Sequence, residues 1–133
     1  MHLVRFKGVT DMREAYFRAK RKSVDEWIYG GLLRNDGPRI FTEAMNNSFR
    51  VREETICRYS GICDINNRQI FENDVMMIDG KMLIIAYRKV KDKFVASDGR
   101  HIYENVDLSN GMIIGNTIDN PELRKRGKAG FTT

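Results

Sequence analysis

The sequence has few of the residues that hold small secreted or metal-dependent proteins together. Its 133 residues contain two cysteines, two histidines and two prolines. Cys57 and Cys63 fit neither a C-x-x-C redox pair nor a zinc knuckle, and a zinc site with His2 and His101 would need ligands from distant segments. We therefore expect reduced cysteines that pack in the interior, with no metal and no cofactor.

Long apolar runs are also lacking. The most apolar stretch, "MLIIAY", is far too short to cross a bilayer, and the start "MHLVRFKG" lacks the apolar core of a secretory signal. We expect a cytoplasmic protein that does not bind membranes. Hydrophobic residues make up 41% and charged residues 31% of the chain, an ordinary globular balance at a length that suits one domain.

Turn signals divide the second half of the chain into short strands. An Asp79-Gly80 pair stands between the apolar runs of "VMMIDGKMLIIAY", which predicts a tight hairpin because a type I′ turn needs positive φ at both central residues. Further on, "SDGR" and "SNG" separate "KFVA", "HIYENVDL" and "MIIGN". That spacing is typical of a sandwich or a small barrel.

The first third of the chain is less regular. "DMRE" could be a capping box that opens a helix through Lys22, with Asp11 as N-cap and Glu14 three residues on. Against this, "FRAK" alternates apolar and basic residues as a strand does, so the pattern alone leaves both readings open. We expect "TEAMNNSFRVREE" to be a polar connecting loop or a short helix.

The polar block "YSGICDINNRQIFENDV", Tyr59 to Val75, has the composition of a metal loop but not its pattern. Counted from Asp64, the sixth and twelfth places of a calcium loop hold Gln69 and Val75 instead of Gly and Glu. Because Asn tolerates left-handed backbone geometry and short carboxylates can accept neighbouring amides, we interpret the block as turns around the strands "TICRY" and "RQIF". The residues of this structural turn motif are Gly61, Asp64, Asn67, Glu72, Asn73 and Asp74.

Candidate catalytic groups do not form a coherent set. Glu72 and Asp74 could face the same way and perform acid–base or metal chemistry, but a charged turn is the simpler interpretation. Ser97, Asp98 and His101 lie close in sequence without the pattern of a nucleophile elbow. We therefore expect no catalytic residues and no enzymatic activity.

Basic residues give the chain a net charge of +5 and a pI near 9.4. They gather in two clusters, Arg18, Lys20, Arg21 and Lys22 near the start and Arg124, Lys125, Arg126 and Lys128 near the end. One hypothesis is that the first cluster contacts nucleic-acid phosphates while Trp27 or Tyr29 stacks on bases. It requires Arg18 and Lys20 to face solvent. The alternative is an ordinary solvated strand face with buried aromatic residues.

Three segments together, "FRAKRKSVDEWIYGGLL", "ETICRYSGICDINNRQIFENDV" and "IIGNTIDNPEL", are more particular than any of these patterns. They resemble the YopX-like family of phage and prophage proteins over residues 12 to 123. The matching positions are Phe17, Arg18, Trp27, Tyr29, Gly30, Thr55, Tyr59, Gly61, Asp64, Ile70, Glu72, Asp74, Val75, Ile114, Gly115, Asn116, Asn120, Pro121, Glu122 and Leu123. Ser60 stands where the family usually has Thr, and Asn67 and Asn73 where it has Gly.

The resemblance implies a mainly β fold with little helix. It implies an SH3-like small barrel over about residues 55–116, a further β-rich N-terminal segment, and strands at "YFRAK" and "WIYGG". It also divides the chain into an N-terminal extension (residues 1–11), a single domain (residues 12–123) and a basic flexible tail (residues 124–133). The family brings no catalytic residues to transfer.

The function expected on these grounds is that of a phage- or prophage-encoded accessory protein in the host cell cytoplasm. It would be a binding module that acts through contacts with a protein partner or through self-association. Nucleic-acid binding through the basic N-terminal strand and the tail is the alternative.

Overall fold

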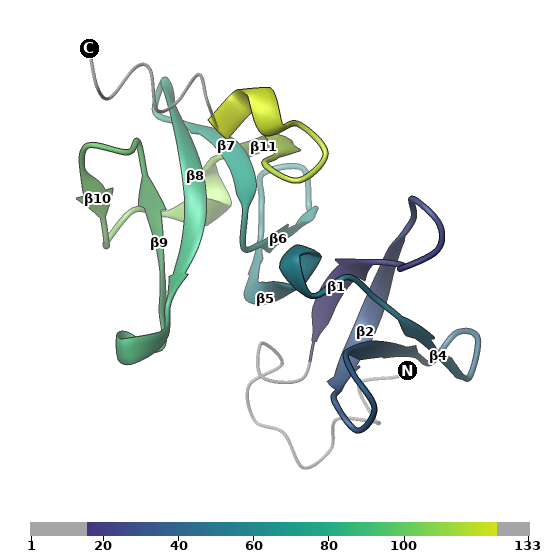
Figure 1. Cartoon of the computed structure of the whole chain (residues 1–133). Helices are drawn as coiled ribbons and strands as arrows, with labels where there is room; N and C mark the ends of the chain where they lie inside the picture. The colour runs from purple at the N-terminus through teal and green to yellow at the C-terminus, as the bar shows by residue number, and fades with distance from the viewer. Residues whose placement is uncertain (1–15, 125–133) are drawn as a thin grey trace. The chain divides into compact units, whose positions relative to one another are not determined.

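A computed structural model describes residues 16–124 of the chain (Figure 1). The expected N-terminal extension, the capping box at Asp11 and Glu14, and the basic tail beyond Arg124 lie outside the described residues. The chain divides into two compact units, one ending at Gly61 and the other beginning at Ile62. Each unit is described by itself.

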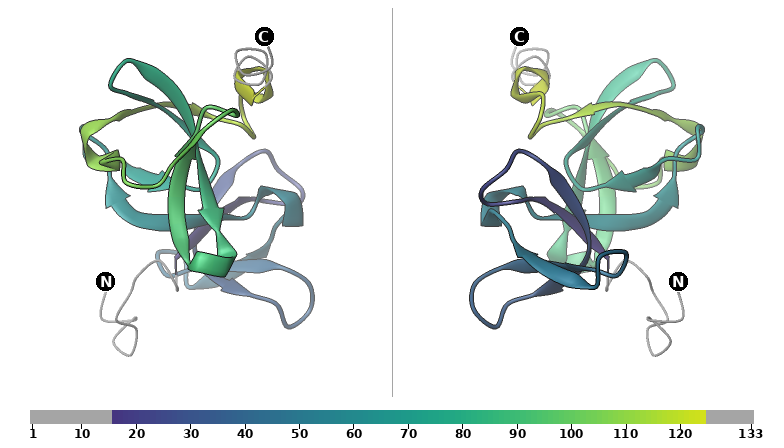
Figure 2. Two further views of the ribbon diagram at one scale, coloured as in Figure 1. Left: turned by 90° about the vertical axis from the view of Figure 1, so that its left-hand side faces the viewer. Right: turned by 90° about the vertical axis from the view of Figure 1, so that its right-hand side faces the viewer.

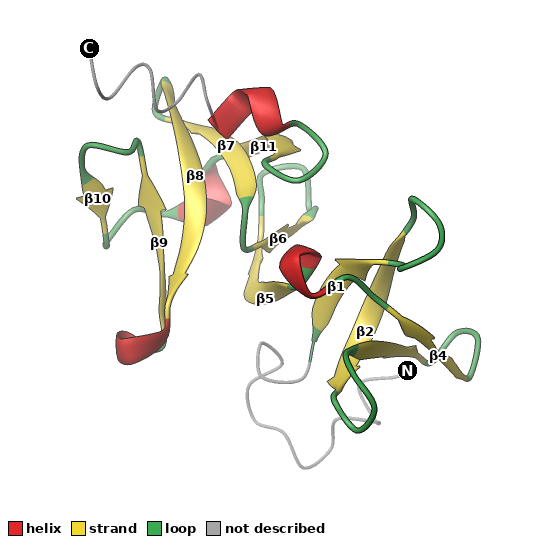
Figure 3. Cartoon of the chain, in the orientation of Figure 1, coloured by secondary structure: helices red, strands yellow, loops and turns green. Residues whose placement is uncertain are grey.

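The described residues are mainly β with little helix, as the sequence predicts (Figure 3). The strands are β1 (Phe17–Lys20), β2 (Trp27–Leu33), β3 (Arg39–Thr42), β4 (Asn47–Arg50), β5 (Cys57–Cys63), β6 (Gln69–Phe71), β7 (Asp74–Ile78), β8 (Lys81–Arg88), β9 (Lys93–Ser97), β10 (Ile102–Tyr103) and β11 (Met112–Asn116). Short 3-10 turns are η3 (Glu53–Thr55), η4 (Lys89–Lys91) and η5 (Leu108–Asn110), and residues 121–124 form one helical turn. No helix in this part of the chain is long and apolar enough to cross a membrane.

The strands form two sheets. One has the order β4-β3-β2-β1-β5-β6 and the other the order β10-β9-β8-β7-β11. Every ladder that pairs these strands in a described register is antiparallel. Between residues 16 and 124 neither sheet closes on itself, so the SH3-like barrel expected over residues 55–116 is not confirmed.

The first unit contains the strands expected at "YFRAK" and "WIYGG", now β1 and β2, which pair with Lys20 opposite Trp27. The prediction of a polar connecting loop or short helix over residues 42–54 is wrong for Asn47–Arg50, which forms β4 against β3, and for Thr42, which ends β3. Asn46 has φ 51° in the turn that joins β3 to β4, a conformation that suits Asn. The interior of the unit consists of Phe17, Ala19, Ile28, Ile40 and Val51.

Close packing of the backbone in the first unit explains one glycine of the family motif. Gly30 lies on β2 next to β3, and a Cβ atom built on it would lie 1.9 Å from the carbonyl oxygen of Phe41. No side chain fits at that distance. The first Gly of "WIYGG", Gly30, is therefore required because the backbone of β3 lies so close to it.

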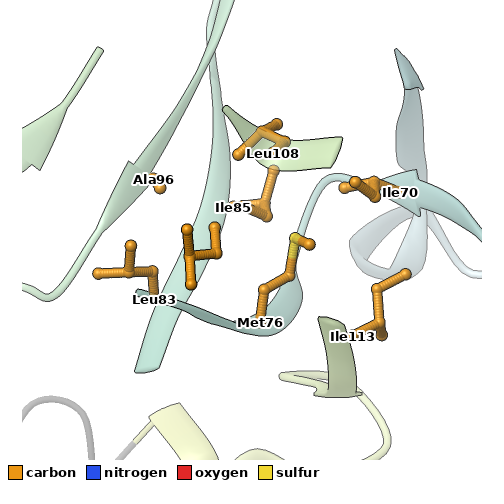
Figure 4. Packing of buried hydrophobic residues seen from close by; sticks show 8 residues of the cluster. Ile70, Met76, Leu83, Ile85, Ala96, Leu108 and Ile113 are labelled. Atoms are coloured by element: carbon orange, nitrogen blue, oxygen red, sulfur yellow. The ribbon is translucent and has the colours of Figure 1, made fainter. Parts of the chain in front are cut away.

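The second unit is organised by the hairpin of β7 and β8, which confirms the turn predicted at Asp79-Gly80. These two residues have φ angles of 52° and 79°, both positive, as a type I′ turn requires. One face of the sheet carries the interior, where Ile113, Met76 and Leu83 stand opposite one another on β11, β7 and β8. Figure 4 shows these three side chains with Ile70, Ile85, Ala96 and Leu108.

Candidate functional site

Asp64 of the polar block is a buried carboxylate that organises a turn. Its Oδ1 accepts hydrogen bonds from the backbone amides of Asn66 and Arg68, at 2.9 and 2.8 Å. Its Oδ2 accepts from the amide of Ile113 at 3.0 Å, across 49 residues of sequence. Asp64 therefore fixes the loop between β5 and β6 and also ties that loop to β11.

The electrostatics of Asp64 follow from these contacts. Burial alone would raise the pKa of its carboxyl group, but the three backbone amides and the charge of Arg68 hold the pKa below its usual value. The ionised form is thus the one that the fold stabilises. In this loop Asn67 has a φ angle of 63°. Gly61, near the end of β5, also has a positive φ angle, 85°.

The second half of the polar block forms the tight turn between β6 and β7. Asp74, also buried, accepts a hydrogen bond from the amide of Phe71 at 2.8 Å. Asn73 has φ 75° and is held on both sides, since its amide donates to the carbonyl of Ile85 and its carbonyl accepts from the amide of Thr117. Glu72 is half-buried beside it. These contacts use the carboxylate of Asp74 to hold a bend in the chain.

The closing family motif, "IIGN" followed by "NPEL", is also structural. A Cβ atom on Gly115 would lie 2.7 Å from Oδ1 of Asn120 and 3.0 Å from a methyl carbon of Leu123, so Gly is needed where the helical turn packs on β11. Oδ1 of Asn116 accepts hydrogen bonds from the amides of Ile118 and Asp119. Oδ1 of Asn120 in turn accepts from the amide of Asn116 at 3.2 Å.

The basic N-terminal strand is not the solvated face that the nucleic-acid hypothesis requires. Arg18 and Lys20 are only 8% and 5% exposed, so the expectation that they face solvent is wrong. The guanidinium carbon of Arg18 lies 4.4 Å from the centre of the Trp27 ring, and Nζ of Lys20 lies 5.0 Å from it. The ring of Trp27 attracts both cations through its negative face, and Lys20 is further paired with Asp25 at 2.8 Å.

The other residues of this cluster are spread along the first unit. Arg21 is paired with Glu26 at 2.9 Å and lies over the ring of Phe49. The backbone amide of Lys22 donates to Arg50 while its side chain is exposed, and Tyr29 is exposed on β2. The structure thus brings Arg18, Lys20 and Trp27 together, but the two cations are buried against the ring and do not form an exposed binding surface.

The remaining candidate groups do not come together as a site. Cys57 is buried and Cys63 half-buried, and neither forms a disulfide. Asp98 accepts hydrogen bonds from the amides of His101 and Arg100, which lower its pKa, so its carboxylate shapes the turn before β10. Within residues 16–124 no three His, Cys, Asp or Glu side chains are grouped in a way that could hold a metal ion.

Sequence reasoning missed two surface features of the second unit. Met112, Met77 and Met82 stand opposite one another on β11, β7 and β8, one residue out of step with the interior row. We call these three residues the methionine row. The second feature is η4, at the tip of the hairpin of β8 and β9. The unbroken apolar run "VMMI", which puts apolar residues on both faces of a strand, could have revealed the first feature, and the basic run "RKVKDK" the second.

The described residues thus form a small β protein with two antiparallel sheets. The carboxylates of its sequence motifs hold tight turns. A family model described as YopX protein matches residues 16–125. The match spans most of the chain, which therefore belongs to the YopX family, as its sequence motifs indicate. No curated protein is similar enough to the chain to be matched.

Proposed function

We propose that this chain is a phage- or prophage-encoded accessory protein that catalyses no reaction and acts in the host cytoplasm as a binding module, through protein contacts. The observation that carries the proposal is the methionine row. The part of the proposal that concerns catalysis is supported by the carboxylates of the polar block. Asp64 and Asp74 accept hydrogen bonds from backbone amides and so hold turns.

The methionine row lies on the face of its sheet opposite the interior. Residues directly opposite in an antiparallel pair project on the same face, and alternate residues share that face. Met76 and Leu83 point into the interior cluster, so Met77 and Met82 point away from it. Met112 is 43% exposed and Ile114, in the bulge of β11, is 42% exposed.

The chemistry of this face favours a protein partner over a charged one such as a nucleic acid. The next row along the same face contains Gly115, Val75, Ile84, Ser97 and Ile102, of which Val75 is fully buried. Neither this row nor the methionine row carries a charged side chain. Methionine is flexible and polarisable, and it is overused at surfaces that adapt to protein partners. An uncharged apolar face is complementary to itself, which makes a second copy of the chain the first partner to test.

The test is self-association of the purified chain, measured as molar mass against concentration by light scattering or sedimentation. We expect the wild-type mass to rise with concentration and Met112→Glu to remain monomeric, because the change places a charge in the contact. Met45→Glu is the matched control, since Met45 is a methionine that is 61% exposed in the turn between β3 and β4 of the first unit.

Two results would contradict the proposal in this form. One is a wild-type chain that stays monomeric at every concentration. The other is equal loss of association in the Met112→Glu and Met45→Glu variants. Thermal melts of all three proteins are needed so that a loss of folding is not mistaken for a loss of contact.

A further inference from the structure

The tip of the β8–β9 hairpin breaks two rules of local structure at one place. Val90 in η4 is 99% exposed, although it is apolar. Arg88 and Lys93 stand directly opposite each other in the ladder, and like charges in that position are unfavourable. Departures from local rules are expected where a surface serves a function.

Positive charge is concentrated at this tip. Arg88, Lys89, Lys91 and Lys93 lie within six residues of sequence, and we call this group with Val90 the hairpin tip. Glu104 faces it from the segment after β10, with Nζ of Lys93 at 3.1 Å and Nζ of Lys91 at 3.9 Å. The hydrogen bond from Lys93 and the charges of Lys91 and Arg88 lower the pKa of Glu104.

The hairpin tip is also held in a defined shape. Asp92 has φ 49° at the end of η4 and its carboxylate accepts a hydrogen bond from the hydroxyl of Tyr87 at 2.6 Å. Below this turn the rings of Tyr87 and Phe94 pack with their centres 5.1 Å apart. The left view of Figure 2 shows the turn at the end of the two strands. A preorganised surface loses less conformational entropy on binding.

We propose that the hairpin tip binds duplex nucleic acid, with its cations on phosphates of the backbone and Val90 in the groove. A two-stranded ribbon fits the major groove of B-form DNA, where apolar side chains contact thymine methyl groups. Cations on both strands of the ribbon can reach the phosphates that border the groove. This surface differs from the methionine row and from the basic N-terminal strand.

An anionic membrane is the competing partner, and the composition of the tip disfavours it. Membrane-surface segments combine basic residues with several large apolar or aromatic side chains. Here a single valine is exposed among the cations of η4. One valine supplies little apolar area for insertion, whereas the cations match a row of phosphates.

The experiment is fluorescence anisotropy of a labelled duplex DNA with the full chain, titrated at several salt concentrations. If three or so phosphates are neutralised, the logarithm of the binding constant should fall with that of salt with a slope of about −3. Lys89→Glu should weaken binding and reduce the magnitude of the slope by about 1. Lys81→Glu, an exposed lysine at the other end of β8, is the matched control and should bind as the wild type does.

Two further variants separate the roles within the tip. Glu104→Gln removes the carboxylate that competes for Lys91 and Lys93, so it should raise affinity several-fold. Val90→Ser should weaken binding without changing the salt slope, because it removes a groove contact and no charge.

Four outcomes would overturn the proposal. They are no binding to duplex at low salt, equal loss in the Lys89→Glu and Lys81→Glu variants, no gain in Glu104→Gln, and binding to phosphatidylserine vesicles but not to duplex. Melting temperatures of the variants show whether they fold. The methionine row is unchanged in all of them, so self-association provides a separate readout.

Discussion

At the scale of single residues, buried carboxylates stabilise this protein by accepting backbone amides. Asp64 accepts three of them, and the ionised form is a much stronger acceptor than the neutral acid. Because its folded pKa lies below the ordinary value, its stabilisation is fully present above about pH 4 and is lost as the pH falls through the lower, folded value.

We predict that Asp64→Asn lowers the free energy of unfolding at neutral pH by about 1–3 kcal/mol, the cost of weakening buried hydrogen bonds. The difference from the wild type should shrink as the pH falls below about 4, because Asp64 then takes up a proton in the unfolded chain, while the folded carboxylate takes one up only at a lower pH. Denaturant unfolding at a series of pH values measures this.

Asp79→Asn is the control for this experiment. Asp79 is exposed in the type I′ turn, where Asn is equally suited to positive φ. Its stability should stay close to that of the wild type at every pH. A constant difference between Asp64→Asn and the wild type down to low pH would contradict the role given to the ionised carboxylate.

For the basic strand β1, the sequence predicted the secondary structure but not the burial of its charged side chains. Alternation in "FRAK" correctly predicts a strand, but it also predicts that Arg18 and Lys20 face solvent. The alternation fails because Trp27, on the neighbouring strand, covers both cations. Which aromatic ring lies over which cation depends on strand order and register, and these are long-range properties that a local pattern does not contain.

At the scale of elements, the turns were the easiest feature to predict from the sequence, and the pairing between strands was the hardest. The Asp79-Gly80 hairpin could be predicted because its φ requirement is local. β4 could not, since "NSFR" is polar and gains its place by pairing with β3. The methionine row likewise depends on the register of three strands.

The approach of β3 to β2 at Gly30 gives the prediction at this scale. Gly30→Ala should destabilise the first unit by more than about 3 kcal/mol, because a Cβ atom would overlap a backbone oxygen that cannot move aside cheaply. Gly80→Ala is the comparison, since nothing lies within 4 Å of its Cβ position. It should cost only about 1 kcal/mol for the left-handed backbone.

Chemical denaturation of both variants checks this prediction. Equal losses in Gly30→Ala and Gly80→Ala would mean that the backbones of β2 and β3 can separate to admit a methyl group. The Gly in "WIYGG" would then need another explanation.

At the scale of the whole molecule, residues 16–124 form two hydrophobic interiors, one in each unit. The first unit packs around Ile40 and the second around Ile85, both fully buried, and their clusters share no residue. The sequence predicts a mainly β chain and the family, but not this division. The boundary falls within β5, where no proline, glycine-rich linker or change of composition marks it.

The two interiors should respond separately to matched changes. Ile40→Ala and Ile85→Ala each remove a buried side chain of the same size and should each cost about 2–5 kcal/mol. Hydrogen exchange should rise mainly in β1 to β4 for the first and mainly in β7 to β9 for the second. An equal rise in both units for either variant would show that the chain opens only as one cooperative body.

The contact of Asp64 with β11 has one more consequence. The outer edge of a sheet exposes amides and carbonyls that can template the addition of foreign strands, a common route to fibrils. At β11 the amide of Ile113 is taken by Asp64, and the carbonyl of Gly111 by the amide of Ile65. Because this loop occupies two backbone groups at the edge of the sheet, we expect it to hinder the addition of further strands there and so the growth of fibrils.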